Sequence, residues 1–272
     1  MASFGNYFTY NGHSSSEFNC IIATFDQVDS YNTGLFRDVQ RGDINRYRYK
    51  PNHFGTVYAD VLTFNVTLIK NICDSNEAQC FSRSEYREIA AWLTEPEYPK
   101  LYEMTEYTED WNDEAECYFG IFSNVENHAA GEIVGITATF TCDSPFAWGP
   151  LKTVSWSESG PKTVNIDSDV KYTYPIISFT ANSACSIAFR NITDDDSIIF
   201  EAPTGGDVIV IDSNKLTITD NAGIPIYLSD IGVSDPTTVY WPRLLQGNNT
   251  LTYTGDATVT MTYREARKVG AY

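Results

Sequence analysis

The second half of the chain is a succession of short apolar segments separated by turn residues, and this spacing limits the folds open to it. Gly205-Gly206 and the run Asp220 to Gly223 are typical of the separating turns. Many short strands at even spacing predict a β-sandwich or jelly roll. The expected strands cover residues 152–157, 162–166, 176–181, 186–190, 197–201, 207–211, 216–219, 226–228, 250–253 and 258–263.

The first half also contains strand-like segments, together with one helix. The strand-like segments cover 18–25, 58–69, 117–122 and 133–140. Ser82 and Glu85 have the spacing of a capping box, and Ile89, Trp92 and Leu93 follow on one helical face before Pro96. We expect this helix to pack its apolar face, Trp92 included, against a sheet.

A boundary between two domains is predicted near residue 145. Pro145, Gly149 and Pro150 lie close together, as in a linker or a corner. With 272 residues the chain is long enough for two domains, and we place them at 1–145 and 146–272.

The charge of the chain argues against nucleic acid and membrane partners over the whole surface. The formal net charge is −18, whereas neutralising phosphates or an anionic membrane requires an excess of Lys and Arg. No apolar run has the length of a membrane span. The first residues show neither a basic segment nor a long apolar one, so we expect no secretion signal.

The sequence shows no recognisable catalytic or metal-binding motif. It lacks a nucleophile elbow, a phosphate-binding loop and a dinucleotide-binding glycine pattern, and its three histidines are far apart. Asp194, Asp195 and Asp196 lack the glycine and distal glutamate of a calcium loop, so a solvated turn is expected there. We therefore expect no enzyme activity, no metal and no cofactor.

The six cysteines are expected to be reduced and mostly buried. Their density is far below that of a disulfide-rich scaffold. A disulfide between Cys73 and Cys80, which flank a polar stretch, is the alternative.

Two segments of opposite charge are candidate contact surfaces between subunits. Residues 37–50 form the basic island of an acidic half, and residues 103–116 hold seven acids. The island is either a solvated hairpin or a surface that meets an acidic partner. We suggest that the two segments meet across neighbouring subunits or rings; the residues concerned are Arg37, Arg41, Arg46, Arg48, Glu106, Glu109 and Asp110.

Several short motifs, taken together in order, resemble one family. They are Phe8 to Gly12, Arg87 to Leu93 with Tyr98 to Leu101, Tyr118 to Phe122, Phe140 to Phe146, and Trp241 to Asn249 with Val259 to Arg264. Each alone is a turn or a core pattern. Their order and spacing are similar to the distal tail protein (Dit) family of siphophage and prophage tails.

The resemblance implies a structural protein of the virion. It implies a mainly all-β fold, with an N-terminal ring-forming β-sandwich that carries one short helix and a hairpin, followed by a C-terminal galectin-like β-sandwich. It also implies a homohexameric ring at the tail tip or baseplate, assembled in the host cytoplasm. The implied partners are the tail tube protein, the tail-tip protein and a receptor-binding protein, with no sequence-specific nucleic acid and no membrane insertion.

Two rival functions remain open from the residues alone. Five Trp and eighteen Tyr would suit a carbohydrate-binding module or a lectin-like adhesion protein, although most such aromatics belong to cores or interfaces. A cell-wall hydrolase would require a catalytic constellation that the sequence does not reveal.

Overall fold

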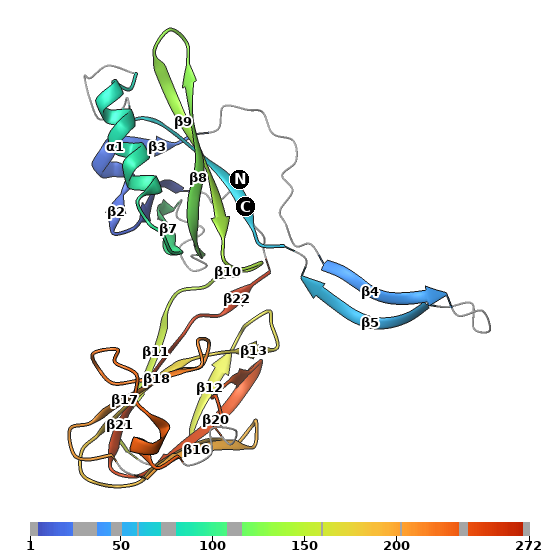
Figure 1. Cartoon of the computed structure of the whole chain (residues 1–272), viewed down its shortest axis with the longest axis vertical. Coiled ribbons are helices and arrows are strands. Elements are labelled where there is room, and N and C mark those ends of the chain that lie inside the picture. The colour runs from blue at the N-terminus through green and yellow to red at the C-terminus, as the bar shows by residue number, and fades with distance from the viewer. Residues whose placement is uncertain are drawn as a thin grey trace. The chain divides into compact units, whose positions relative to one another are not determined.

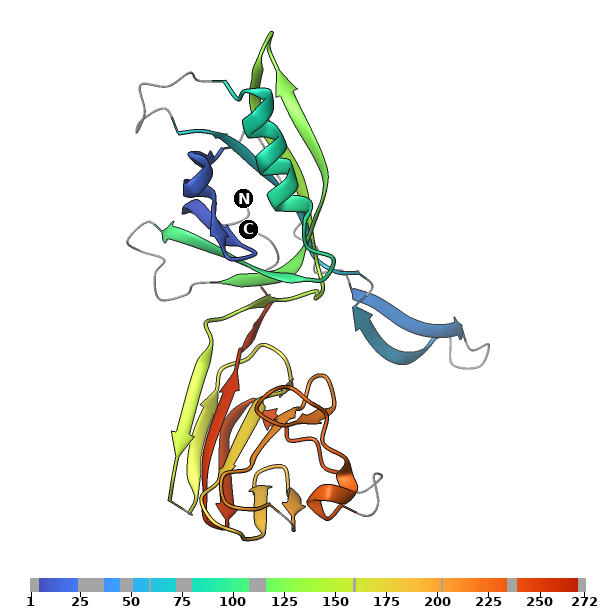
Figure 2. The ribbon, with the colours of Figure 1, turned by 60° about the vertical axis from the view of Figure 1, so that its left-hand side comes forward.

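The computed structural model describes residues 5–23, 37–44, 51–58, 60–71, 80–107, 116–158, 160–201, 203–233 and 239–268. The chain divides into two compact units. The first runs to Gly149 and also takes in Arg267, and the second covers Pro150–Ala266. Strands dominate both units (Figures 1 and 2), which confirms the mainly β class.

The first unit is built on one antiparallel sheet with the order β2-β1-β7-β8-β9-β6-β3. Strand β1, next to the end strand β2, comes close to β3 at the other end of this order, so the sheet curls around its core. The short strands β10 and β22 pair beside β8. The bounds are β1 Gly5–Tyr10, β2 His13–Ser14, β3 Cys20–Ile22, β6 Thr63–Lys70, β7 Lys100–Tyr107, β8 Cys117–Ala129, β9 Ile133–Cys142, β10 Ala147–Trp148 and β22 Ala266–Arg267.

Helix α1 (Arg83–Thr94) begins where the capping box predicts. The Ser82 hydroxyl accepts from Glu85 N at 3.2 Å, and Glu85 Oε2 accepts from Ser82 N at 2.6 Å. The helix lies along β8 (Figures 1 and 2). Ile89, Trp92 and Leu93 are buried in the core of the unit, so the prediction for this helix is confirmed.

The core of the first unit is rich in aromatic rings. Tyr102 and Phe140 have their ring centroids 5.1 Å apart, and Phe122 and Phe140 are 4.8 Å apart. The side chains of Phe8 and Tyr10 are fully buried beside them. These rings therefore join β1, β7, β8 and β9 into one packed body.

Two expectations for the first unit are wrong in detail, and one strand was not expected. The run 58–69 is interrupted at residues 60–62, so it forms the end of one strand and β6. The segment 18–25 begins in the 3₁₀ helix η1 (Ser15–Phe18), because Ser14 and Glu17 form a second capping box there. The acidic stretch starts inside strand β7, where Tyr102 and Met104, on either side of Glu103, are buried in the core.

The second unit is a β-sandwich, as the strand spacing predicts. One sheet has the order β11-β21-β14-β17-β18 and the other β12-β20-β15-β16. Phe179 lies between them, with ring centroids 5.7 Å from Phe189 and 5.6 Å from Phe200. The bounds are β11 Lys152–Trp156, β12 Lys162–Ile166, β13 Tyr172–Thr173, β14 Ile176–Ala181, β15 Ile187–Asn191, β16 Asp196–Phe200, β17 Val208–Asp212, β18 Thr217–Thr219, β19 Leu244–Leu245, β20 Gly247–Thr254 and β21 Ala257–Tyr263.

The strand expected at 226–228 does not form. Pro225 makes only an isolated bridge with Thr219, and Ile226 N donates to Ile218 O before the chain enters the 3₁₀ helix η3 (Leu228–Ile231). Proline has no N–H with which to continue a ladder, which explains why the pairing stops there.

The turn before β20 follows the chemistry of its residues. Gly247 has a φ of 89°, which favours glycine. The Asn249 side chain is fully buried; its Oδ1 accepts from Leu245 N at 2.8 Å and its Nδ2 donates to Leu245 O at 2.6 Å. One amide thus closes the turn, which is a structural role.

Candidate contact surfaces and the polar hollow

The described part of the basic island, residues 37–44, forms strand β4 (Arg37–Ile44), which pairs as a hairpin with β5 (Pro51–Tyr58). Arg37 is in register with Tyr58, and Arg41 is in register with His53. Among the described strands, β4 and β5 pair only with each other. A two-stranded hairpin on its own is marginally stable in water, so this one requires further contacts to hold its shape.

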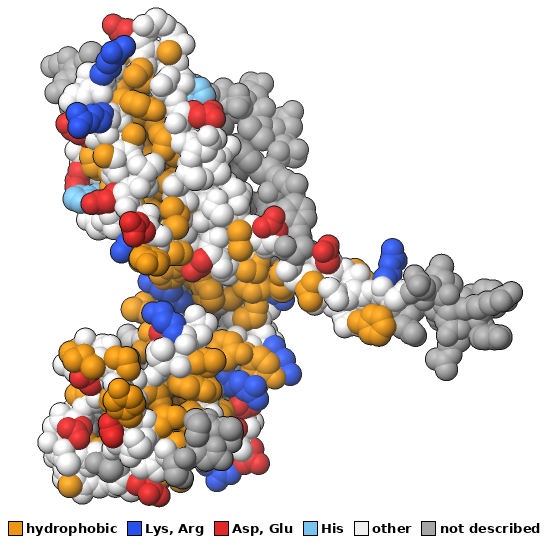
Figure 3. Space-filling view, viewed as in Figure 1, with side chains coloured by type: hydrophobic (Ala, Val, Ile, Leu, Met, Phe, Trp, Pro, Cys, Tyr) orange, Lys and Arg blue, Asp and Glu red, His pale blue; other side chains and the backbone are white. Residues whose placement is uncertain are grey.

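The hairpin exposes large apolar side chains (Figure 3). Phe54 is 72% exposed, Val39 55% and Val57 45%. Exposed apolar groups gathered on one element are typical of a surface that a partner covers. The charge pattern of the sequence does not reveal these residues, because an apolar strand residue reads the same in the sequence whether or not another element covers it.

The structure places only part of the two charged segments. Arg37 and Arg41 lie on β4, whereas Arg46 and Arg48 fall outside the described residues. Glu106 lies on β7, in the curled sheet and therefore in a different sheet from Arg41; Glu109 and Asp110 fall outside the described residues. Their contact across subunits stays a prediction.

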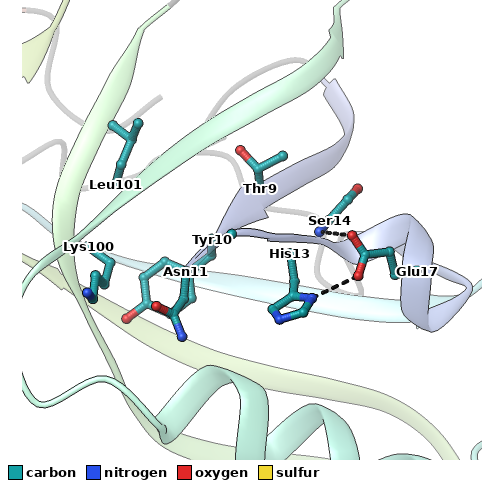
Figure 4. A pocket seen from close by; sticks show the side chains of 9 residues that line it. Thr9, Tyr10, Asn11, His13, Ser14, Glu17, Lys100 and Leu101 are labelled. Atoms are coloured by element: carbon teal, nitrogen blue, oxygen red, sulfur yellow. Dashed lines mark hydrogen bonds and ion pairs between the residues drawn. The ribbon is translucent and has the colours of Figure 1, made fainter.

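An open polar hollow of about 590 Å³ lies beside the turn between β1 and β2 (Figure 4). His13 Nδ1 and Glu17 Oε2 are 2.9 Å apart, and Glu17 Oε1 accepts from Ser14 N at 3.1 Å. The hydrogen bond with His13 is the main cause that holds the pKa of Glu17 below its usual value, and the hydrogen bond from Ser14 N adds to it. One carboxylate oxygen thus caps η1 and the other is paired with His13, which favours a structural role over general acid–base chemistry.

Two of the three acids in the turn Asp194 to Asp196 form ion pairs with arginines. Arg243 Nε lies 2.7 Å from Asp194 Oδ2, and Tyr240 OH donates to the same oxygen at 3.1 Å. Arg190 Nη2 lies 2.6 Å from Asp195 Oδ1. Within the described ranges no group of three His, Cys, Asp or Glu side chains is arranged to hold a metal ion.

Four of the described cysteines carry free thiol groups. Cys20, Cys80, Cys142 and Cys185 are free, and Cys73 lies outside the described residues. Burial is the main cause that raises the pKa of Cys20 and of Cys142 to about 12. Such thiols are poor nucleophiles at neutral pH.

None of the helices in the described part of the chain is long and apolar enough to cross a membrane.

Comparison with known protein families finds a phage tail family for each of the two parts of the chain. The family described as phage tail protein N-terminal domain matches residues 4–144, and that described as phage tail C-terminal domain matches residues 146–263. No curated protein matches the sequence.

Solved structures share the fold of nearly the whole chain. The Dit protein (gp 19.1) of phage SPP1, described as a paradigm of the hub adsorption apparatus in phages that infect Gram-positive bacteria, has a TM-score of 0.64 at 13% identity. The match covers 95% of this chain and 98% of that one. A chain of the phage P2 baseplate in its activated conformation with Ca has a TM-score of 0.58 at 8% identity and covers 96% and 98%.

Proposed function

The chain belongs to the phage tail proteins, in both its N-terminal and its C-terminal domain, and from this premise we propose that it is the distal tail hub of a phage or prophage tail. In this role it forms a homohexameric ring that joins the end of the tail tube to the tip protein and anchors host-adhesion components. The ring assembles in the host cytoplasm and remains at the tail tip of the virion. The role is structural and uses neither enzyme activity nor a cofactor.

The order of the two units carries this proposal. Both tail domains follow one another without an inserted module, and the fold over 95% of the chain is that of a Dit hub protein. The first unit builds the ring and the second unit, a plain sandwich, lies outside it. The bound partners are the tail tube protein, the tail-tip protein and, on the second unit, a receptor-binding protein.

The hairpin β4–β5 is the element best suited to close the ring. It combines exposed Phe54, Val39 and Val57 with the bases of the island, so a neighbouring subunit can cover its apolar side chains and match its charge. Each hairpin then gains the packing that a lone pair of strands lacks.

Labelling of intact tails tests the location. We expect antibodies raised against this chain to decorate the tip end of purified tails in electron micrographs, with no label along the tube. Label spread along the whole tube, or none on intact and on partly disassembled tails, would contradict the role as a distal hub.

A further inference from the structure

The hairpin β4–β5 is tied to the first unit by the short connection that follows β5. β5 ends at Tyr58, and Leu62, a few residues later, is fully buried in the core. Leu62 N donates to Ser144 O at 3.2 Å, and Leu62 O accepts from Cys142 N at 2.8 Å. Both partners belong to residues 142–146, which we call the corner. The backbone that leaves the hairpin is therefore fixed to the corner.

The corner is itself held in one shape. Asp143 N donates to Phe119 O on strand β8 at 2.8 Å. The Ser144 side chain is buried, and its Oγ accepts from Phe146 N at 3.1 Å, as in a serine turn. Pro145 between them has a backbone φ restricted by its ring. These contacts lie outside the hairpin, so the corner forms a firm support beside its base.

The ring of Phe146 extends from the corner to the last residue of β5. Its centroid lies 4.7 Å from that of Tyr58, and the two ring planes are at 80°, the edge-to-face geometry that aromatic pairs favour. Tyr58 is in register with Arg37 at the start of β4, so this contact is at the base of the hairpin. Phe54, farther along β5, is 72% exposed. The corner thus supports the base of the hairpin and leaves the apolar side chain of Phe54 to a partner.

Two contacts at one base have a consequence for binding. If the Leu62 backbone alone held them, two strands that pair only with each other among the described strands could swing about their connection. The ring of Phe146 against Tyr58 adds a second point of contact that limits this swing. A surface that is already oriented binds with a smaller loss of freedom, and a closed ring repeats that loss at each interface. The contact with Phe146 is therefore suited to orient the hairpin for assembly.

We propose that the corner directs the hairpin toward the neighbouring subunit, with Phe146 as the positioning residue that acts through Tyr58. This inference rests on the proposed function, because it assumes that the hairpin closes the ring. It gives a role to the end of the motif Phe140 to Phe146, which in the sequence is a boundary pattern. The role does not require Phe146 to touch the neighbour.

The test measures the direction of the hairpin and the assembly of the chain separately. Spin labels on unnatural amino acids at Asp38 on β4 and Glu88 on α1, both exposed, report the distance between hairpin and helix in the dilute, unassembled chain. Sedimentation velocity over a range of concentrations, alone and with a tail tube protein and a tail-tip protein, reports assembly. Phe146→Ala removes the ring contact, whereas Phe146→Tyr keeps an aromatic ring there. Phe18→Ala is the matched control, because Phe18 is a half-buried ring of the same unit that stacks on Trp92.

We expect Phe146→Ala to broaden the distance distribution and, because the hairpin is no longer oriented in advance, to raise the concentration needed for half-assembly about tenfold. Phe146→Tyr and Phe18→Ala should behave like the wild type, and thermal unfolding checks each fold. If Phe146→Ala does not fold, Tyr58→Ala removes the same contact from the side of the hairpin. A wild-type distribution or wild-type assembly in the variant that lacks the contact, or equal loss in Phe18→Ala, would overturn the inference. A wild-type chain that forms no ring, alone or with its partners, would instead refute the proposed function.

Discussion

Trp92 is the residue through which α1 is held to the core of the first unit. Its side chain is 5% exposed, its ring stacks on Phe18 at 4.6 Å and on Phe8 at 5.4 Å, and its Nε1 donates to Tyr10 O at 3.0 Å. One side chain thus joins the helix to β1 and to η1.

We expect Trp92→Ala to lower the free energy of unfolding by about 3–5 kcal/mol, the range for aromatic-to-alanine changes in cores. Denaturant unfolding of the purified chain measures this change. Tyr98→Ala is the control, because Tyr98 is 74% exposed and its loss should leave the unfolding midpoint nearly unchanged. Equal effects of the two variants would show that the helix is not anchored through Trp92.

Glu85 connects the start of α1 with strand β6 and makes the fold sensitive to acid. Its Oε1 lies 2.6 Å from Lys70 Nζ, and the Lys70 side chain is only 6% exposed. Burial raises the pKa of Glu85, but the hydrogen bonds from Lys70 and Ser82 together outweigh this and hold the pKa below its ordinary value of 4.5.

A lowered pKa stabilises the fold above the ordinary pKa, and this contribution is lost as the pH falls through the lowered value. We therefore expect the melting temperature of the wild type to exceed that of Glu85→Gln near neutral pH, and the difference to shrink below pH 4.5. Thermal melts across this pH range measure it. A difference that stays constant down to pH 2 would contradict the ion pair as its source.

At the scale of elements, the helix and most strands of the second unit can be predicted from the sequence because local chemistry determines them. The capping box of Ser82 and Glu85 sets the start of α1, and the alternation in segments such as 176–181 sets the strands. Strand β7 is difficult to predict from the sequence because acidic residues interrupt its apolar pattern. Only Tyr102 and Met104 show the two-residue period of a strand. Whether β4 and β5 join a larger sheet depends on distant pairing, which local patterns do not encode.

The apolar side chains of the hairpin lead to a test of the ring contact. We expect Phe54→Lys to weaken assembly, because Phe54 is 72% exposed and a neighbour would otherwise bury it. Tyr227→Lys is the control, since Tyr227 is 78% exposed but lies on the second unit. Sedimentation velocity compares the two; loss of assembly in both, or in neither, would argue against the hairpin.

The charged segments lead to a second, independent test. If the island contacts the acidic stretch of a neighbour, changing Arg41, Arg46 and Arg48 to Glu should hinder assembly while the monomer stays folded. Exposed ion pairs contribute only about 0–1 kcal/mol each, but several act at every interface of a ring. Changing Glu106, Glu109 and Asp110 to Lys in the same chain should restore assembly, because both signs are then reversed. Normal assembly of the triple Glu variant at every salt concentration would indicate a solvated hairpin.

At the scale of the whole molecule, the fold class follows from patterns along the chain, but the surfaces do not. Phe54 and Phe140 are both apolar strand residues, yet one is 72% exposed and the other fully buried. Their difference arises from which strands pair and which elements cover them. The residues proposed to meet partners are therefore found in the structure, whereas the charge of the basic island is evident from the sequence.

The measurement that tests the central claim most directly is the mass of the assembled particle. Light scattering of the purified chain, alone and mixed with a tail tube protein and a tail-tip protein, gives this mass without a model of shape. The account predicts a ring of six 30.5 kDa chains, 183 kDa, either alone or on its partners. A chain that stays at 30.5 kDa at high concentration and also fails to join either partner would contradict it.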